Sequence, residues 1–261
     1  MSRGRANKVT TYKNLPPSIR DKTWVVLTES DPSIQQYLTN FSGKCVVAPS
    51  WVSNYSDKFQ WLMDQVSQSE KKAVIMDDDL RFATREGDKL LAVATKDQEI
   101  KLEDVLMSIE DHLDDVPLVS LHPRQMGHLA PLPYKENGKV ICMQGINMET
   151  IGNVVVNDYP ILADVALNLN VLSRGLGNRL LTEAVLDYGS CQADGGCSLT
   201  RTANVQKEAV EHYASLYPHW FKVVKKKPKG ENWLADEEGY RYDFRGAWKK
   251  LNKDAPNATN D

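Results

Sequence analysis

The sequence has few cysteines, no long apolar run and no excess of positive charge. Its four cysteines, Cys45, Cys142, Cys191 and Cys197, include no CxxC pair, which argues against a disulfide framework and against a zinc site. No stretch reaches the length of about 18 apolar residues that a membrane span requires, and the opening MSRGRANKVTTYK has no apolar core like that of a signal peptide. The net charge of −3 excludes a general positive field, so any polyanion would have to bind a local basic patch. We therefore expect a reduced, cytoplasmic protein that does not enter a membrane.

The composition is that of a globular protein. Of the 261 residues, 41% are hydrophobic and 26% are charged, which is enough apolar material for one large domain with a substantial core. No internal repeat and no clear linker divides the chain. We expect one domain over residues 1–251, followed by a disordered polar tail over residues 252–261, NKDAPNATND.

Strand and helix patterns alternate regularly near the start of the chain. Apolar β-branched runs predict strands, and apolar residues at helical spacing predict helices. The expected elements are strand 24–28, helix 33–41, strand 45–48, helix 57–69 with Asp57 as its cap, and strand 73–76. This order predicts right-handed βαβ crossovers and a parallel sheet that is covered on both faces.

The rest of the chain has a more mixed pattern. The expected elements are a helix over 102–113, strands at 117–121, 140–145 and 153–156, a helix at 161–172, a strand at 184–188 and a helix at 204–216. The Pro- and Gly-containing segments 122–139 and 189–198 are expected to be loops. The fold class that we predict is α/β, a single domain in which a Rossmann-like βαβαβ half is followed by a mixed sheet.

Three consecutive aspartates, Asp77, Asp78 and Asp79, follow the third strand in the stretch VIMDDDL. Ligands of open α/β sheets bind just beyond the carboxyl ends of the strands. Three carboxylates crowded there raise one another's pKa, and a divalent cation would relieve the repulsion. Carboxylate oxygens suit Mg²⁺ or Mn²⁺, which keep part of their coordination shell for substrate phosphates. The alternative is an acidic turn that caps a helix or faces solvent.

The aspartate run and the start of the chain both carry a resemblance. An Asp-Asp-Asp after that strand resembles the nucleotide-sugar site of glycosyltransferases with the GT-A fold, in which aspartates hold a divalent metal on the diphosphate. The opening SRGRANKVTTYKNLP is similar to the SRGR opening of such enzymes. This resemblance implies a GT-A-like domain in which Asp77 and Asp79 hold Mg²⁺ or Mn²⁺. The nucleotide-sugar contacts that it implies are Arg3, Arg5, Thr10 at the start of the first helix, Asp77, Asp78 and Asp79.

Asp164 lies in the stretch YPILADVALNLNVLSRG, at the start of an expected helix. The stretch resembles the x-Glu-Asp motif beneath the acceptor of many GT-A enzymes, although Ala163 stands where Glu is common. The resemblance implies that Asp164 is the catalytic base if the transfer inverts the sugar configuration, whereas a retaining enzyme needs no base there. An aspartate in a first helical turn also complements the helix dipole, which is a purely structural role.

Together these features resemble the TET-associated glycosyltransferase family, found largely in bacteriophages, over about residues 2–250. The resemblance implies transfer of a sugar from a nucleotide donor, a UDP-sugar, to the hydroxymethyl group of a 5-hydroxymethylpyrimidine such as 5-hydroxymethylcytosine in DNA. For a phage protein the compartment would be the host cytoplasm. Three rivals remain open: a glycosyltransferase with a carbohydrate or protein acceptor, a nucleotidyltransferase with the same metal chemistry, and a module that binds modified DNA without turnover.

Basic residues late in the chain are candidate phosphate ligands. Lys225, Lys226 and Lys227 in FKVVKKKPKGENW would give salt-dependent contacts to a DNA backbone, and a lysine-protected edge strand is the alternative. Arg201 in ADGGCSLTRT could bind a donor phosphate through two parallel hydrogen bonds. A glycine-rich turn without a ligand would explain that stretch equally.

The loop HPRQMGHL carries Arg124 and His128. A loop of this kind could present donors and acceptors to the DNA acceptor. An exposed loop with no ligand is the alternative.

Overall fold

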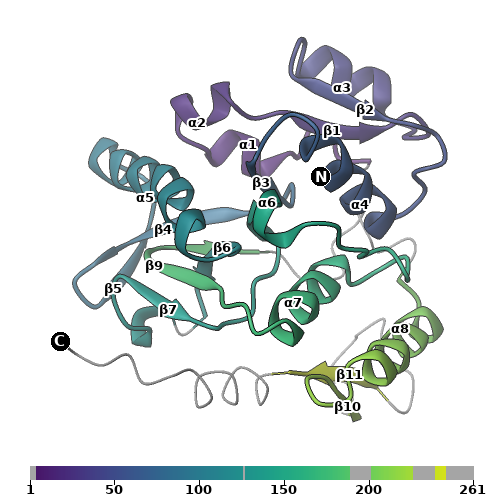
Figure 1. Cartoon of the computed structure of the whole chain (residues 1–261). Coiled ribbons are helices and arrows are strands. Elements are labelled where there is room, and N and C mark those ends of the chain that lie inside the picture. The colour runs from purple at the N-terminus through teal and green to yellow at the C-terminus, as the bar shows by residue number, and fades with distance from the viewer. Residues whose placement is uncertain (1–3, 126, 189–200, 226–238, 245–261) are drawn as a thin grey trace.

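A mixed sheet occupies the centre of the molecule (Figure 1). The computed structural model describes residues 4–125, 127–188, 201–225 and 239–244, and within these the sheet has seven strands. Their order is β3 (Lys72–Met76), β8 (Met143–Asn147), β6 (Leu118–Pro123), β9 (Arg179–Asp187), β4 (Arg81–Glu86) and β5 (Lys89–Ala92), and β7 (Tyr134–Glu136) pairs with the first part of β9. The protein is therefore an α/β protein with a mixed sheet, as predicted.

The strand directions gather several chain segments at one edge of this sheet. β8 is antiparallel to both β3 and β6, and β6 is parallel to β9. The carboxyl ends of β3, β6 and β9 therefore lie at the same edge. The first residues of β8 and of β4, which is antiparallel to β9, lie there too. Ligands of α/β proteins bind at such an edge.

Helix α5 (Lys96–Asp115) covers one face of the sheet (Figure 1). A capping box starts it: the Thr95 side chain accepts from the backbone N–H of Gln98, whose own side chain accepts from the Thr95 N–H. Its buried apolar stripe consists of Leu102, Val105, Leu106, Ile109 and Leu113. The helix approaches β8 at Gly145, where a Cβ atom would lie 2.7 Å from Ile109 Cγ2. This close packing confirms the helix expected over 102–113 and explains the glycine.

The other face of the sheet is covered by α4 (Tyr55–Val66) and α7 (Ala163–Ser173), which pack against each other and share one core cluster with side chains of β3, β8, β6 and β9. Helix α7 is almost entirely apolar and buried, in agreement with the helix expected at 161–172. The N-cap of α4 is Asn54 and not Asp57: the Asn54 side chain accepts from the N–H of Asp57, 3.0 Å away. Asp57 lies in the first turn instead, where a carboxylate is also favourable.

The first strands form a separate unit. β1 (Val25–Thr28) and β2 (Cys45–Ala48) are parallel and are joined by α3 (Ile34–Asn40), so the first predicted crossover is present. The prediction that the third strand joins the first two in one parallel sheet is wrong. β3 is hydrogen-bonded to β8, in antiparallel direction, and not to β1 or β2. Two short helices, α1 (Thr10–Asn14) and α2 (Pro17–Asp21), precede β1, and α1 contacts β4 of the central sheet.

The end of the described chain forms a third unit. Helix α8 (Ala203–Leu216) begins at the N-cap Thr202 and packs on the antiparallel pair β10 (Lys222–Lys225) and β11 (Tyr240–Asp243) (Figure 1). The helix expected at 204–216 is confirmed. The loop expected at 189–198, with Cys191 and Cys197, and the tail at 252–261 lie outside the described residues.

Several predicted strands differ from the structure. The strand expected at 140–145 lies at Met143–Asn147, and the strand expected at 184–188 is the second half of β9. Residues 153–156 form no strand: Val154 and Val156 are buried, but the Val156 N–H donates to Gln60 Oε1 at 2.8 Å. The alternation of buried and exposed valines there reflects packing against α4 and not pairing with another strand. The hairpin β4–β5, the short helix α6 (Met148–Ile151) and the 3-10 turn η1 (Gly127–Leu129) were not expected.

No helix among the described residues combines the length and the apolar character that crossing a membrane requires. Cys45 and Cys142, the two described cysteines, are free thiols.

Candidate active site

The three aspartates form the turn that joins β3 to β4, at the edge of the sheet where β6 and β9 also end. The buried Thr11 side chain fixes this turn from below. Its hydroxyl donates to the carbonyl of Asp77 at 2.6 Å and accepts from the N–H of Leu80 at 2.8 Å. The Thr11 N–H also donates to the carbonyl of Asp78 at 3.0 Å. One threonine of α1 therefore holds the backbone of the whole aspartate turn.

Arg5 neutralises two of the aspartates. One guanidinium nitrogen lies 3.2 Å from Asp78 Oδ1 and 3.3 Å from Asp79 Oδ2. The backbone around it is anchored to the N-terminal unit, because the Arg5 N–H donates to the Tyr37 hydroxyl at 2.8 Å and the Gly4 N–H donates to Asp31 at 3.0 Å. Arg5 thus lies at the predicted site, where it contacts the carboxylates. Asp78 is buried, so its carboxylate is shielded from solvent and helps to stabilise the turn.

Asp77 is brought together with Asp164. Burial, together with the negative charges of Asp164, Asp79 and Asp78, raises the pKa of Asp77 to about 7. Burial is the largest cause of this shift, and the neighbouring carboxylates add to it, so Asp77 lies in a buried place close to other acidic groups. Cys142, just before β8, has a left-handed φ of 64°. Its carbonyl accepts from the Asp77 N–H at 2.8 Å.

Asp164 lies in the first turn of α7, as predicted. The chain enters the helix through Leu162 in the left-handed conformation, with φ 71°, and Asp164 Oδ1 accepts from the N–H of Val165 at 2.9 Å. Burial raises the pKa of Asp164, although Lys139 and Arg201 oppose this change. A carboxyl group with a raised pKa beside a ligand edge is suited to accept a proton.

Two basic residues lie near Asp164. Lys139 and Arg201 both interact electrostatically with this carboxylate, and both also interact with Tyr242 of β11. Arg201 therefore lies near Asp164, and its role as a phosphate ligand stays a prediction. Lys139 was not predicted, and its ammonium lies 4.6 Å from the centroid of the Tyr242 ring.

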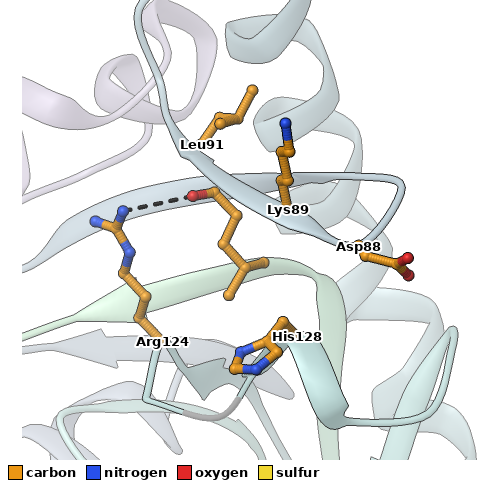
Figure 2. Close-up of a pocket in the computed structure, with 6 residues that line it drawn as sticks. Asp88, Lys89, Leu91, Arg124 and His128 are labelled. Atoms are coloured by element: carbon orange, nitrogen blue, oxygen red, sulfur yellow. Dashed lines mark hydrogen bonds between the residues drawn. The ribbon is translucent and has the colours of Figure 1, made fainter.

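The two predicted acceptor residues of the loop after β6, Arg124 and His128, line a separate pocket of about 400 Å³ (Figure 2). A guanidinium nitrogen of Arg124 donates to the backbone carbonyl of Leu90 at 3.4 Å, drawn as a dashed line in Figure 2, and another lies 3.5 Å from Asp187. Lys89 adds a further cation to the lining. The residues that line this pocket include none of the aspartates of the first site.

The other predicted contacts are distributed more widely. Thr10 begins α1, as expected, but its hydroxyl donates only to the carbonyl of Lys8 at 3.3 Å, in an exposed position. Lys225 is exposed at the end of β10, and its ammonium lies 5.0 Å from the centroid of the Tyr240 ring. Three other predicted residues, Arg3, Lys226 and Lys227, lie outside the described residues.

The residues present fit a divalent cation bound mainly by its substrate. Among the described residues no group of three or more His, Cys, Asp or Glu side chains forms a ready metal site. Mg²⁺, however, is held in many enzymes by one or two carboxylates together with substrate phosphates and water. Asp77 and Asp79, two carboxylates directly after β3 with Asp164 nearby, match that requirement.

Three residues near the site, Thr11, Lys139 and Tyr242, were not predicted from the sequence, because long-range contacts give them their role. Thr11 is adjacent to the predicted Thr10, but only the contact with the aspartate turn distinguishes the two threonines. Lys139 lies in a loop segment, ENGK, that carries no motif. Tyr242 reaches the site from the far end of the chain. No local pattern identifies these residues.

The fold and the site define a class of protein. An α/β domain with a cluster of carboxylates beyond the carboxyl ends of its strands, flanked by basic side chains, has the arrangement of an α/β enzyme with its active site at the sheet edge.

The family is shown by comparison with known proteins. Residues 1–185 match the family TET-Associated Glycosyltransferase, which is more than two thirds of the chain. The chain belongs to this family and is a glycosyltransferase. The match includes Asp77, Asp79, Lys139 and Asp164, and it ends before Arg201 and β11. No match was found among curated proteins or among solved structures.

Proposed function

We propose that this protein transfers a sugar from a UDP-sugar to the hydroxymethyl group of a 5-hydroxymethylpyrimidine in DNA, with the help of Mg²⁺ or Mn²⁺. The observation that carries the proposal is the meeting of Asp77 and Asp79, at the end of β3, with Asp164 at the start of α7. Segments far apart in the sequence thereby bring three carboxylates together, which supports a donor site beside a base, as transfer between two bound substrates requires.

Asp77 and Asp79 would hold the metal. The chemistry supplied by a divalent cation held there would be neutralisation of the negative charge on the departing diphosphate. Arg5, paired with Asp79 at 3.3 Å, would keep this carboxylate oriented. Thr11 fixes the backbone between them, so the two ligands would be positioned before the donor binds.

Asp164 would act as the general base. Its carboxylate would take the proton of the hydroxymethyl group while the hydroxyl oxygen forms a bond to the anomeric carbon of the sugar. The bond from this carbon to the diphosphate oxygen breaks, and its electron pair leaves with the nucleoside diphosphate. This direct displacement inverts the anomeric configuration. The raised pKa of Asp164 supports the role, because it makes the carboxylate a better proton acceptor near neutral pH.

DNA is proposed as the acceptor on the strength of the family and of two basic surfaces. The pocket with Lys89, Arg124 and His128 and the exposed Lys225 offer contacts to phosphates without reading the base sequence. The reaction would take place in the cytoplasm, which is the host cytoplasm if a phage encodes the chain.

A donor and acceptor screen tests the proposal. Duplexes containing 5-hydroxymethylcytosine, 5-hydroxymethyluracil or unmodified bases would be incubated with each UDP-sugar and Mn²⁺, digested to nucleosides and analysed by mass spectrometry. We expect a nucleoside heavier by one sugar residue, only from a hydroxymethylated duplex and only without EDTA. D79N should abolish the product. D64N, which removes an exposed carboxylate of α4, is the matched control and should not.

The rivals give different results when carbohydrate and protein acceptors are incubated beside the duplexes. Product on a carbohydrate or a protein, with none on DNA, would identify a glycosyltransferase with another acceptor. Nucleotide in place of sugar on the acceptor would identify a nucleotidyltransferase. Binding of hydroxymethylated DNA without any product would indicate a module that has no turnover.

A further inference from the structure

Lys139 lies on a backbone segment that is held from both sides by buried asparagines. Asn178 accepts from the N–H of Gly138 at 2.8 Å and donates to its carbonyl at 2.9 Å. Asn168 accepts from the N–H of Val140 at 3.2 Å and donates to its carbonyl at 2.6 Å. Both asparagines are almost completely buried. Paired bonds of this kind in a buried place fix the backbone on either side of the lysine.

The same network sets the distance from Lys139 to Asp164. The Asn168 side-chain amide also donates to the Asp164 carbonyl at 2.7 Å, and the two asparagine side chains are 3.5 Å apart. Asn168 lies one turn after Asp164 on α7. The lysine segment and the first turn of the helix therefore form one rigid unit.

Tyr242 positions the side chain of Lys139. The ammonium lies 4.6 Å from the centroid of the Tyr242 ring and interacts electrostatically with this tyrosine. Burial alone would lower the pKa of Lys139, but Tyr242 and the charge of Asp164 outweigh burial and raise it. The half-buried lysine is therefore a cation at neutral pH.

The lysine is placed to meet an anion from outside the protein. Among the described residues no carboxylate lies within the 4.0 Å ion-pair distance of its ammonium. An ammonium has three N–H donors, and Asp164 attracts it only across a longer distance. A phosphate oxygen bound between the aspartate turn and Lys139 would complete its hydrogen bonds.

We propose that Lys139 is a phosphate-binding residue of the donor site, whose ammonium donates to an oxygen of the donor's diphosphate. Tyr242 and the pair Asn168 and Asn178 are its positioning residues. This inference rests on the proposed function, because a nucleotide-sugar supplies the diphosphate. It also means that β11, beyond the family-matched residues 1–185, contributes to the active site.

Calorimetric titration with inorganic pyrophosphate, and separately with UDP, tests the inference on the full chain. K139Q should weaken binding of both probes by about 10-fold or more, as expected for loss of a hydrogen bond from a charged donor. K139R keeps the charge and should stay within about threefold of the wild type. Y242F removes only the hydroxyl and should weaken binding by about threefold. The melting temperature of each variant, measured without ligand, should remain that of the wild type.

Tyr240 provides the matched control. It lies on the same strand as Tyr242, but its ring contacts Lys207 and Lys225, whose ammonium groups are 5.1 and 5.0 Å from the ring centroid. Y240F should bind both probes like the wild type. If K139Q also binds both probes like the wild type, the proposed role of Lys139 is wrong. If Y240F weakens binding as much as Y242F, the positioning role of Tyr242 is wrong.

The experiment separates this inference from the proposed function, because neither probe needs an acceptor. A protein that binds pyrophosphate through Lys139 but never modifies DNA would contradict only the DNA acceptor. A wild type that binds neither probe would contradict both proposals.

Discussion

The substitution T11V removes one hydroxyl group beneath the aspartate turn. Valine has nearly the same shape as threonine, so packing around this buried position is kept. The lost oxygen donates to the Asp77 carbonyl at 2.6 Å and accepts from the Leu80 N–H at 2.8 Å. The backbone bond from the Thr11 N–H to the Asp78 carbonyl does not depend on the side chain and remains.

The cost follows from the two groups that lose their partner. Leu80 is fully buried, so its N–H has no access to water, and the Asp77 carbonyl is partly buried. An unsatisfied buried polar group costs about 1–3 kcal/mol, and the more accessible carbonyl costs less. We therefore expect T11V to lower the free energy of unfolding by about 2–4 kcal/mol and the melting temperature by about 5–10 °C.

The neighbouring threonine makes the test specific. The Thr10 hydroxyl is exposed and makes a single bond of 3.3 Å to the Lys8 carbonyl, so T10V should change stability by less than about 0.5 kcal/mol. Calorimetric melting of wild type, T10V and T11V under identical conditions measures the difference. Equal stability of T10V and T11V would refute the claim that Thr11 holds the turn.

Three further outcomes follow from the fold. G145A should destabilise the protein by about 1–3 kcal/mol in urea unfolding, because the new Cβ would lie 2.7 Å from Ile109 Cγ2; unchanged stability would contradict the close packing of α5. R85M should lower the melting temperature, because the buried Arg85 guanidinium donates to several carbonyls of the 127–130 loop, and an unchanged value would show that the loop is held otherwise. Burial lowers the pKa of His122, so the unfolded chain binds its proton more readily and stability should fall as the pH drops below about 6.5. H122Q should reduce this fall, measured as the difference in melting temperature between pH about 7.5 and about 5.5, and an unaltered difference would contradict the assignment.

The carboxylate part of the site could be predicted because each of its groups lies at the end of a regular element. Asp77 and Asp79 follow a strand that its apolar run reveals, and Asp164 opens a helix that its apolar stripe reveals. Elements of this kind place their ends at a sheet edge by simple geometry. The convergence of these residues needed no knowledge of the side chains between them.

The basic part of the site depends on contacts that the sequence does not encode locally. Lys139 acquires its position from Asn168 and Asn178, and Tyr242 approaches it from β11. The antiparallel pairing of β3 with β8 was equally hidden, because a buried apolar strand has the same pattern in either direction. The periodicity of apolar residues does not determine strand pairing partners or long-range hydrogen bonds, and these fix the direction of β3 and the position of Lys139.

The most direct test of the account is sugar transfer by D164N compared with the wild type on hydroxymethylated DNA, with donor binding measured in parallel. We predict that the wild type forms the glycosylated nucleoside, that D164N forms it at least about 100-fold more slowly, and that both bind UDP with Mn²⁺ equally well. A D164N variant as fast as the wild type, or a wild type that modifies no hydroxymethylated base with any UDP-sugar, would contradict the central claim.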